Sequence, residues 1–276
     1  MAVEEDYRRA AAWIGACDGL LIGAGAGMGV DSGLPDFRGD EGFWRVYPAL
    51  RESEISFVEM ANPKWFEQAS ERAWGFYGHR LNLYRKTRPH AGFSLLKAWG
   101  ETQPCGGFVF TSNVDGQFQT AGFDHQRIVE CHGSIHFLQC TLPCSQKIWS
   151  ADDLSIEIDT QRCQAVGPLP TCPNCGRVAR PNILMFADHT WISTRTDAQH
   201  QRYREWLRES GDRNLTSIEC GAGTSIPTVR EECQKRTRQL IRINPRHPEV
   251  KTGGISLEDP ALAALTSISH YLPGAS

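Results

Sequence analysis

Four cysteines are spaced in a way that suits metal binding. Cys140 and Cys144 form one pair, with three residues between them, and Cys172 and Cys175 form a second pair with two. Each short loop presents two thiolates to one point, as tetrahedral zinc requires, and four thiolates leave no open position for catalysis. We therefore predict structural zinc, with Cys163 as a possible replacement for one ligand. The alternative is a set of separate free thiols.

A glycine-rich segment follows a short apolar run at residues 19–22. Its sequence from residue 25 to residue 38 is GAGMGVDSGLPDFR. Glycines let the backbone approach a ligand closely, and the N–H groups of such a turn attract phosphate. The dinucleotide fingerprint G-x-G-x-x-G does not fit, because Val30 replaces its third glycine, and the Gly-Lys-Ser/Thr end of a P-loop is missing. The segment predicts a phosphate-bearing ligand.

Further polar groups follow predicted strands, where parallel α/β sheets place their ligand-binding residues. Asn113 and Asp115 come directly after the apolar run at 107–111, and His132 follows the run at 127–130. A histidine exchanges protons near neutral pH, so His132 is a candidate general base. An Asn and an Asp at a strand end are, on their own, equally compatible with an ordinary turn.

A helix predicted after Pro63 carries an arginine within its apolar face. Apolar and aromatic residues recur there at steps of three and four, and Arg80 lies between Tyr77 and Tyr84. An arginine in that position needs an anionic partner or access to water, unless its side chain extends to the surface. Tyr77 and Arg80 share one helix face, so together they could bind a carboxylate.

Strands and helices alternate along the chain, which predicts a parallel α/β sheet. The strands are expected at 19–22, 107–111, 127–130, 182–186, 215–219 and 239–243. The helices are expected at 7–14, 63–84, 93–99, 229–238 and 261–272, with short helices in the connecting segment 41–61.

The bulk composition limits the classes of partner. The chain has 276 residues, 22% of them charged, and a net charge of −3, so we expect neither nucleic acid nor an anionic membrane as a partner. Its apolar runs are shorter than the roughly 18 residues of a membrane span, and its N-terminus is acidic rather than basic. Ten cysteines in such a chain favour thiols and metal over disulfides. We expect a cytoplasmic protein.

Together these motifs resemble the bacterial-type sirtuins, which are NAD-dependent protein deacylases. The glycine-rich segment 25–38 is similar to their NAD-binding loop. The other similar motifs are Ser-Asn-Val-Asp at 112–115, Cys-His-Gly at 131–133, Phe-Ala-Asp at 186–188, Gly-Thr-Ser at 223–225 and Ile-Asn at 243–244. They occur in the family's order between about residue 19 and residue 270.

The resemblance implies a role for each motif. Asn113 would hold the nicotinamide ribose and a water, Asp115 the carboxamide, and His132 would act as the base on a ribose hydroxyl; we interpret His136 as an ordinary residue. Phe186 and Ala187 would contribute backbone that pairs with the acyl-lysine peptide as an added strand. The residues expected to contact NAD are Gly25, Ala26, Gly27, Asp36, Phe37, Arg38, Ser112, Gly223, Thr224, Ser225 and Asn244.

The implied fold is a Rossmann-like parallel sheet with a smaller domain made of a zinc-ribbon insert and a helical insert. The NAD-binding domain would comprise residues 1–39, 89–135 and 181–276, the helical insert 40–88 and the zinc insert 136–180. In the implied reaction NAD is consumed: nicotinamide leaves, the acyl oxygen attacks the ribose carbon, and the products are nicotinamide, free lysine and O-acyl-ADP-ribose.

Departures from the family's pattern keep alternatives open. Gly29 replaces a usual Ser, Ser112 a Gln and Phe118 a His, so ADP-ribosyl transfer or NAD hydrolysis on the same fold is an alternative. A non-enzymatic alternative is a zinc-ribbon module that binds nucleic acid or protein, although the cysteine-rich segment has few basic residues.

The sequence is also compatible with more than one type of acyl group on the substrate lysine. Tyr77 and Arg80 resemble the Tyr-x-x-Arg pair of sirtuins that remove succinyl, malonyl or glutaryl groups. Those enzymes usually carry Pro-Thr-Phe-Arg where this chain has Pro-Asp-Phe-Arg at 35–38. We predict a preference for acidic acyl-lysines, with deacetylation or the removal of longer chains as the alternatives.

Overall fold

The computed structural model describes residues 2–36, 39–250 and 253–272; Phe37 and Arg38, both predicted NAD contacts, lie outside these ranges. The α-helices are α1 (Ala2–Ala16), α2 (Gly39–Val46), α3 (Pro48–Glu52), α4 (Phe57–Met60), α5 (Trp65–Gln68), α6 (Ser70–Lys86), α7 (Ala91–Thr102), α8 (Gln117–Thr120), α9 (Thr194–Ser210), α10 (Thr228–Arg236) and α11 (Ala261–Ser269), and two 3-10 helices are η1 (Ala26–Ser32) and η2 (His125–Arg127). The strands are β1 (Gly19–Ala24), β2 (Gly107–Thr111), β3 (Ile128–Glu130), β4 (Gly133–Cys140), β5 (Ile148–Ser150), β6 (Glu157–Asp159), β7 (Gln164–Val166), β8 (Ala179–Ile183), β9 (Leu215–Cys220), β10 (Gln239–Ile243) and β11 (Ile255–Leu257).

The larger part of the molecule is a six-stranded sheet in the order β3-β2-β1-β9-β10-β11, with each neighbouring pair parallel. Ile22 in β1 lies opposite Val109 in β2 and Ile218 in β9. The strand order reverses on passing from β2-β1 to β9-β10, which is the arrangement of doubly wound dinucleotide-binding sheets. Ligands bind such sheets at the carboxyl ends of the strands where the order reverses.

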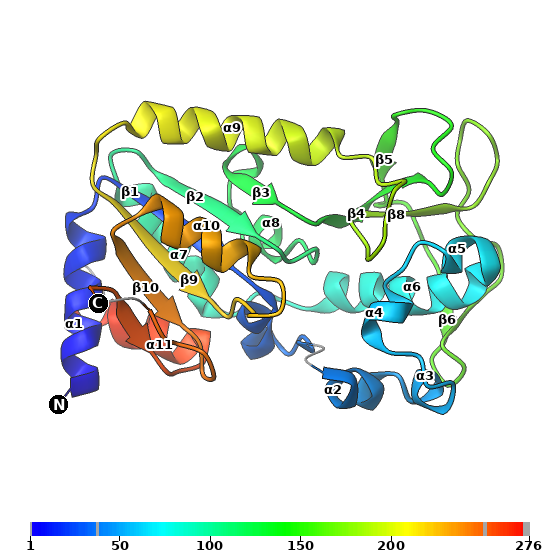
Figure 1. Cartoon of the computed structure of the whole chain (residues 1–276), viewed down its shortest axis with the longest axis horizontal. Coiled ribbons are helices and arrows are strands. Elements are labelled where there is room, and N and C mark those ends of the chain that lie inside the picture. Colours follow the sequence, from blue (N-terminus) through cyan, green and yellow to red (C-terminus); the bar gives the residue numbers. More distant parts are fainter. Residues whose placement is uncertain (1, 37–38, 251–252, 273–276) are drawn as a thin grey trace.

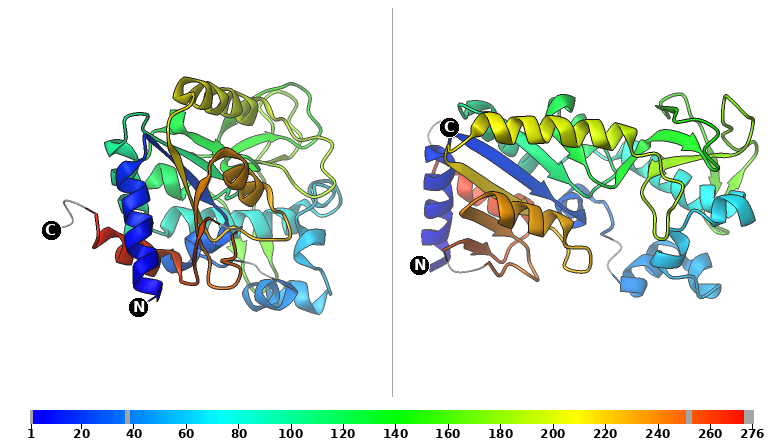
Figure 2. Two further views of the ribbon diagram at one scale, coloured as in Figure 1. Left: turned by 60° about the vertical axis from the view of Figure 1, so that its left-hand side comes forward. Right: turned by 45° about the horizontal axis from the view of Figure 1, so that its top comes forward.

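Helices cover both faces of this sheet, as the alternation of its side chains requires. Leu20 and Ile22 belong to one buried cluster with residues of α1, α7 and α11, whereas Leu21 belongs to another with residues of α9 and α10. In Figure 1, α9 extends along the sheet as far as the smaller part of the molecule, and Figure 2 shows the same helix from two other sides. Both faces are therefore buried, which explains the nearly continuous apolar sequence of β1.

The smaller part is built around α6 and a three-stranded antiparallel sheet in the order β5-β4-β8. Trp74 of α6 donates from its indole Nε1 to the carbonyl of Ala179 in β8, at 2.9 Å. Arg85, near the end of the same helix, donates to the carbonyls of Ala151 and Leu154. The helical segment and the cysteine-rich segment thus pack as one unit. This confirms the predicted fold class, while the residue boundaries of the two domains stay a prediction.

Two predicted elements differ in the structure. The helix expected over 63–84 is two helices, α5 and α6, because Ala69 between them has an extended φ of −154°. The strand expected at 182–186 is β8, at 179–183. Its sequence, ARPNI, contains a proline that only an edge strand tolerates, and the apolar residues that follow it line a cavity instead.

Strand β4 and helix α9 are among the elements that the sequence analysis did not predict. Strand β4 comes directly after His132, and α9 has almost no apolar period, because its buried side chains include Thr196, Gln199 and Ser210. Among the described residues, no helix combines the length and the apolar character needed to cross a membrane.

Candidate active site

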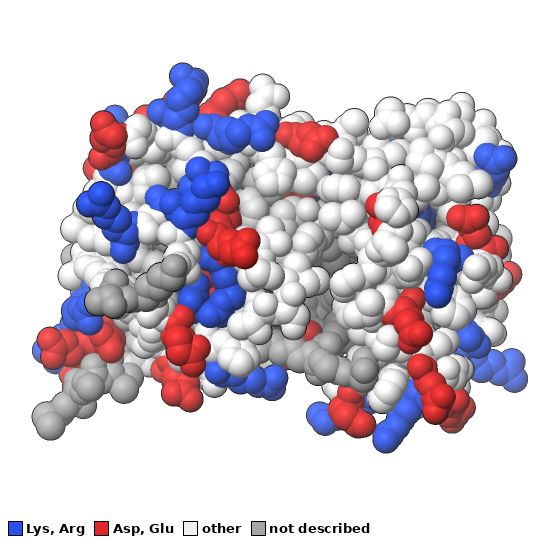
Figure 3. Space-filling view, viewed as in Figure 1, with Lys and Arg blue, Asp and Glu red and all other residues white. Residues whose placement is uncertain are grey.

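A cavity of about 400 Å³ lies between the large sheet and the smaller part of the molecule. Figure 3 shows the hollow between the two halves, with mostly uncharged side chains around it. The predicted site residues that line it are Ala26, Asp36, Tyr77, Arg80, Ser112, Asn113, Asp115, His132 and Phe186. Residues predicted to act on NAD and residues predicted to bind the acyl-lysine therefore face one space.

The turn after β2 holds Asn113 and Asp115 at the edge of the cavity. The Asn113 side-chain amide donates to the Gly25 carbonyl at 3.0 Å, and the Ser112 N–H donates to the Ala24 carbonyl at 3.1 Å. Asp115 is buried, and its Oδ1 accepts a hydrogen bond from the Gln117 N–H at 2.9 Å. These bonds attach the turn to the glycine-rich segment that follows β1.

Burial changes the acid–base properties of Asp115. Desolvation raises the pKa of its carboxyl to about 6, although the hydrogen bond from the Gln117 N–H acts in the opposite direction. Asp115 is therefore a carboxylate at neutral pH that gains a proton in mildly acidic solution.

His132 lies where the chain passes from the large sheet to the small one. The N–H of Cys131 donates to the Thr111 carbonyl of β2, and the His132 carbonyl accepts from the Leu184 N–H after β8, both at 2.9 Å. Gly133, the next residue, has a φ of 78°, and a Cβ there would lie 2.1 Å from the Asn182 carbonyl oxygen. The backbone that presents the imidazole is thus fixed from both sides.

The environment of the His132 imidazole favours the neutral form. Desolvation lowers its pKa below the ordinary 6.5, and a hydrogen bond to the Ser112 main chain opposes this shift. A neutral ring that donates one N–H to a carbonyl keeps its other nitrogen as a proton acceptor. His132 can therefore act as a base at neutral pH.

The glycine-rich segment forms the 3-10 helix η1 rather than an open loop. Gly27 donates its N–H to the Gly221 carbonyl after β9, at 3.0 Å. Gly27 also lines a second cavity, of about 130 Å³. Asp36 lines both this cavity and the large one. The two spaces on either side of the segment suit a ligand with two halves, such as a dinucleotide.

The two later motifs follow β9 and β10. Gly223, Thr224 and Ser225 are exposed in the loop after β9, whereas Asn244 is buried. The Asn244 amide donates to the Ala222 carbonyl at 3.0 Å, and its oxygen accepts from the N–H groups of the two residues 246 and 247. Asn244 thus joins the two loops, and its predicted contact with NAD stays a prediction.

The acyl side of the cavity contains the predicted pair and one residue that was missed. Arg80 is buried among aromatic rings, with its guanidinium carbon 5.2 Å from the Phe76 centroid and 5.9 Å from the Tyr77 centroid. Its Nε donates to the hydroxyl of Tyr84 at 2.9 Å. Tyr77, Arg80 and Tyr84 all line the large cavity. Tyr84 lies four residues after Arg80, and that spacing was the available signal.

Of the segment 186–188, which resembles a peptide-pairing motif, Phe186 is the residue that lines the large cavity. Phe186 also donates its N–H to the Ala61 carbonyl at 2.9 Å. Ala187 has a φ of 52°, in the left-handed region. The Asp188 side chain is fully buried in a bidentate pair with Arg180, at 2.8 and 2.9 Å. That ion pair fixes the turn, and the backbone pairing with a peptide stays a prediction.

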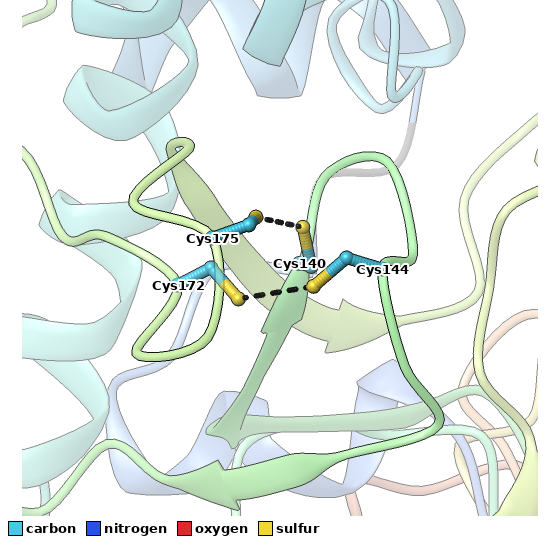
Figure 4. Close-up of side chains that lie close together, drawn as sticks. All are labelled: Cys140, Cys144, Cys172 and Cys175. Atoms are coloured by element: carbon cyan, nitrogen blue, oxygen red, sulfur yellow. Dashed lines mark hydrogen bonds between the residues drawn. The ribbon is translucent and has the colours of Figure 1, made fainter.

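The four predicted metal ligands come together at the far end of β4. Cys140, Cys144, Cys172 and Cys175 place their Sγ atoms within 4.8 Å of one another. Figure 4 shows the two closest pairs, Cys140 with Cys175 and Cys144 with Cys172, each at 3.6 Å. Zinc–sulfur bonds of about 2.3 Å in a tetrahedron require sulfur atoms about 3.8 Å apart, so this donor set fits zinc.

Cys163 is not a ligand of this site. The cluster found in the described part of the chain contains only the four predicted cysteines, and Cys163 is buried in the core of the smaller part. Its main chain packs on α6, because a Cβ on Gly75 would lie 2.1 Å from the Cys163 carbonyl oxygen. The four predicted cysteines form the cluster, and the open alternative, in which Cys163 replaces one of them, does not hold.

Comparison with known proteins agrees with this geometry. The sequence matches the family described as "Sir2 family" over residues 25–204. A relative from Aquifex aeolicus, named NAD-dependent protein deacylase, is 28% identical over 90% of this chain and 92% of its own length. A relative from Archaeoglobus fulgidus, NAD-dependent protein deacylase 1, is 30% identical over 61% of this chain and 60% of its own length.

Solved structures show the same fold. A Sir2 homologue in complex with NAD has a TM-score of 0.68 at 21% identity, covering 97% of this chain and 94% of its own. A Sir2 structure with bound acetylated peptide has a TM-score of 0.68 at 17% identity, covering 97% of this chain and 98% of its own. The family match covers well over half of the chain, and the protein belongs to the Sir2 family.

Proposed function

We propose that this protein is an NAD-dependent protein-lysine deacylase, with nicotinamide, free lysine and O-acyl-ADP-ribose as its products. The observation that carries the proposal is the shared cavity, which brings His132, Asn113 and Asp115 to the same space as the apolar surface around Tyr77. The names of the two relatives, and the acetylated peptide in a structure of the same fold, support an acyl-lysine substrate.

The residues that line the cavity have separate roles in this reaction. Asn113 and Asp115 bind and orient the nicotinamide side of NAD, which supplies a ribose carbon open to attack once nicotinamide leaves. His132 accepts a proton from a ribose hydroxyl at the ring nitrogen that does not face the Ser112 main chain. The apolar wall, which includes Ile183 and Met185, holds the acyl-lysine, and one water enters to complete the products, because the acyl oxygen stays on the ribose carbon.

The zinc site has a different role. Four thiolates close the coordination shell, so a bound ion supplies no catalytic position and instead fixes the ends of β4 and of the 172–175 loop.

The direct test measures both halves of the reaction. The protein is incubated with NAD and one peptide in acetylated, succinylated or unmodified form, and nicotinamide and the acyl product are quantified by chromatography and mass spectrometry. We expect nicotinamide and O-acyl-ADP-ribose in equal amounts, and neither with the unmodified peptide. Nicotinamide release without peptide would indicate NAD hydrolysis, and ADP-ribose attached to the peptide would indicate ADP-ribosyl transfer.

Arg80→Met should lower the preference for succinyl-lysine over acetyl-lysine by about 10- to 100-fold in kcat/KM, the range expected for a charge-assisted hydrogen bond. The reason is that a guanidinium beside the acyl group can bind its carboxylate, whereas the neutral, unbranched methionine side chain cannot. Arg72→Met, on the same helix but not among the cavity-lining residues, is the matched control. An identical ratio in wild type and Arg80→Met would show that Arg80 does not read the acyl group.

The pH profile of kcat/KM for NAD should fall on its acidic side with an apparent pKa of about 6. Burial raises the pKa of Asp115 to about 6, so the carboxylate that binds the carboxamide is lost as the pH falls through that value. Below this midpoint kcat/KM should fall about tenfold per pH unit, as for a single titrating group. Asp115→Asn should have low activity without this dependence. The same limb in Asp115→Asn would assign it to another group, such as His132.

A further inference from the structure

Two residues in the first half of β4 contact the main chain of the Asn113–Asp115 turn. The Ile135 N–H donates to the Val114 carbonyl at 3.0 Å, and the Nε2 atom of His136 lies 2.9 Å from the Asp115 carbonyl oxygen. A main-chain carbonyl can only accept, so this contact is a hydrogen bond only when His136 carries its proton on Nε2. The bond defines the tautomer of His136.

The His136 ring also packs directly on the next residue of the turn. Gly116 has a φ of 72°, and a Cβ at that position would lie 2.7 Å from both Cδ2 and Nε2 of the ring. Within the turn, the Oδ1 atom of Asp115 accepts a hydrogen bond from the Gln117 N–H. The His136 ring thus contacts the main chain of the turn at Asp115 and Gly116, and the Asp115 side chain is bonded within the same turn.

The backbone of His136 has its own anchor. Its carbonyl accepts from the Ala151 N–H at 2.9 Å, and Ala151 in turn accepts from the guanidinium of Arg85 on α6. A change confined to the His136 ring therefore leaves β4 attached to the rest of the smaller part, and removes only the contact with the turn.

We propose that His136 is a positioning residue, which holds Asp115 in the orientation that binds the carboxamide of nicotinamide. This inference rests on the proposed function, because it concerns the nicotinamide half of the NAD site. Loss of the Nε2–H should let the turn relax and misplace the carboxylate. A misplacement of about 1 Å at a reacting site costs up to roughly 100-fold, so we expect an effect of about 10- to 100-fold on steps that involve nicotinamide.

Three variants separate the hydrogen bond from the ring. His136→Phe keeps a ring over Gly116 but has no donor, His136→Gln places an amide N–H near the position of Nε2, and His136→Ala removes both. Each purified variant is first checked for wild-type zinc content and circular dichroism, so that folding is established separately.

Binding of NAD is then compared with binding of ADP-ribose, which lacks nicotinamide. We expect His136→Phe and His136→Ala to weaken NAD binding and to raise the nicotinamide inhibition constant by about tenfold or more, with ADP-ribose affinity and the KM of the acyl-peptide unchanged. His136→Gln should recover most of the loss. Equal NAD affinity and equal nicotinamide inhibition in folded His136→Ala and wild type would overturn the inference, as would a parallel loss of ADP-ribose binding. If the wild type consumes no NAD with any acyl-peptide, the proposed function fails instead.

Discussion

His132→Ala should lose deacylation by a factor of roughly 10²–10⁴, the contribution expected of a general base. The imidazole lines the cavity in its neutral form, because burial lowers its pKa, and alanine offers no proton acceptor in its place. NAD binding should remain measurable. The backbone on either side of His132 is held by the Thr111 carbonyl and the Leu184 N–H, and those bonds do not involve the side chain.

The measurement combines single-turnover deacylation with NAD binding by calorimetry on the same preparation. His125→Ala is the matched control, since His125 is an exposed histidine in η2, just before β3. It should behave as wild type in both assays. Full deacylation by His132→Ala would refute the role of the base, and loss of NAD binding together with deacylation would place His132 in ligand binding instead.

Cys172→Ser should yield protein that is unfolded or insoluble. Cys172 is buried within the four-thiolate cluster, and its removal opens a closed structural shell. The apparent free energy of structural zinc binding, about 10–16 kcal/mol in small zinc domains, is as large as the whole stability of a typical domain, about 5–15 kcal/mol. The protein cannot absorb such a loss through its remaining contacts.

Elemental analysis of wild type should find about one zinc per chain, and a strong chelator should lower the melting temperature. Cys163→Ser is the control, because Cys163 is equally buried but lies outside the cluster; its zinc content should equal that of wild type. Soluble, active wild type without metal would contradict the prediction, and loss of zinc from Cys163→Ser would restore Cys163 as a ligand.

The residues at the ends of the parallel strands were predictable from the sequence for a physical reason. Strands β1 and β2 are largely apolar on both faces, β3 begins with two buried apolar residues, and polar groups that follow these strands must meet at one edge of the sheet. Asn113, Asp115 and His132 indeed line one cavity. The cysteine pairs were predictable because two short loops with two thiolates each leave few geometries other than a common metal site.

The supports of the site were not predictable, because they are polar contacts between distant segments. Glu130 of β3 is buried, and its main-chain N–H and side chain bond to Gln199 of α9, while its carboxylate also pairs with Arg195. Those buried polar residues erase the apolar period by which α9 would be recognised. His136 was interpreted as ordinary for the same reason: its partner, Asp115, is 21 residues away. The predicted cytoplasmic location stays a prediction.

The position of strand β4 determines how a dependence of activity on metal should be interpreted in this protein. It starts at Gly133, directly after the candidate base, and ends at Cys140, a zinc ligand. The seven steps between its two ends span roughly 23 Å at about 3.3 Å per residue, with His136 between them. Chelating agents should therefore inactivate the enzyme even though the metal performs no chemistry, and the specific activity of a preparation should follow its zinc occupancy. Inhibition by such agents would thus result from displacement of β4. It would not show that the metal takes part in catalysis.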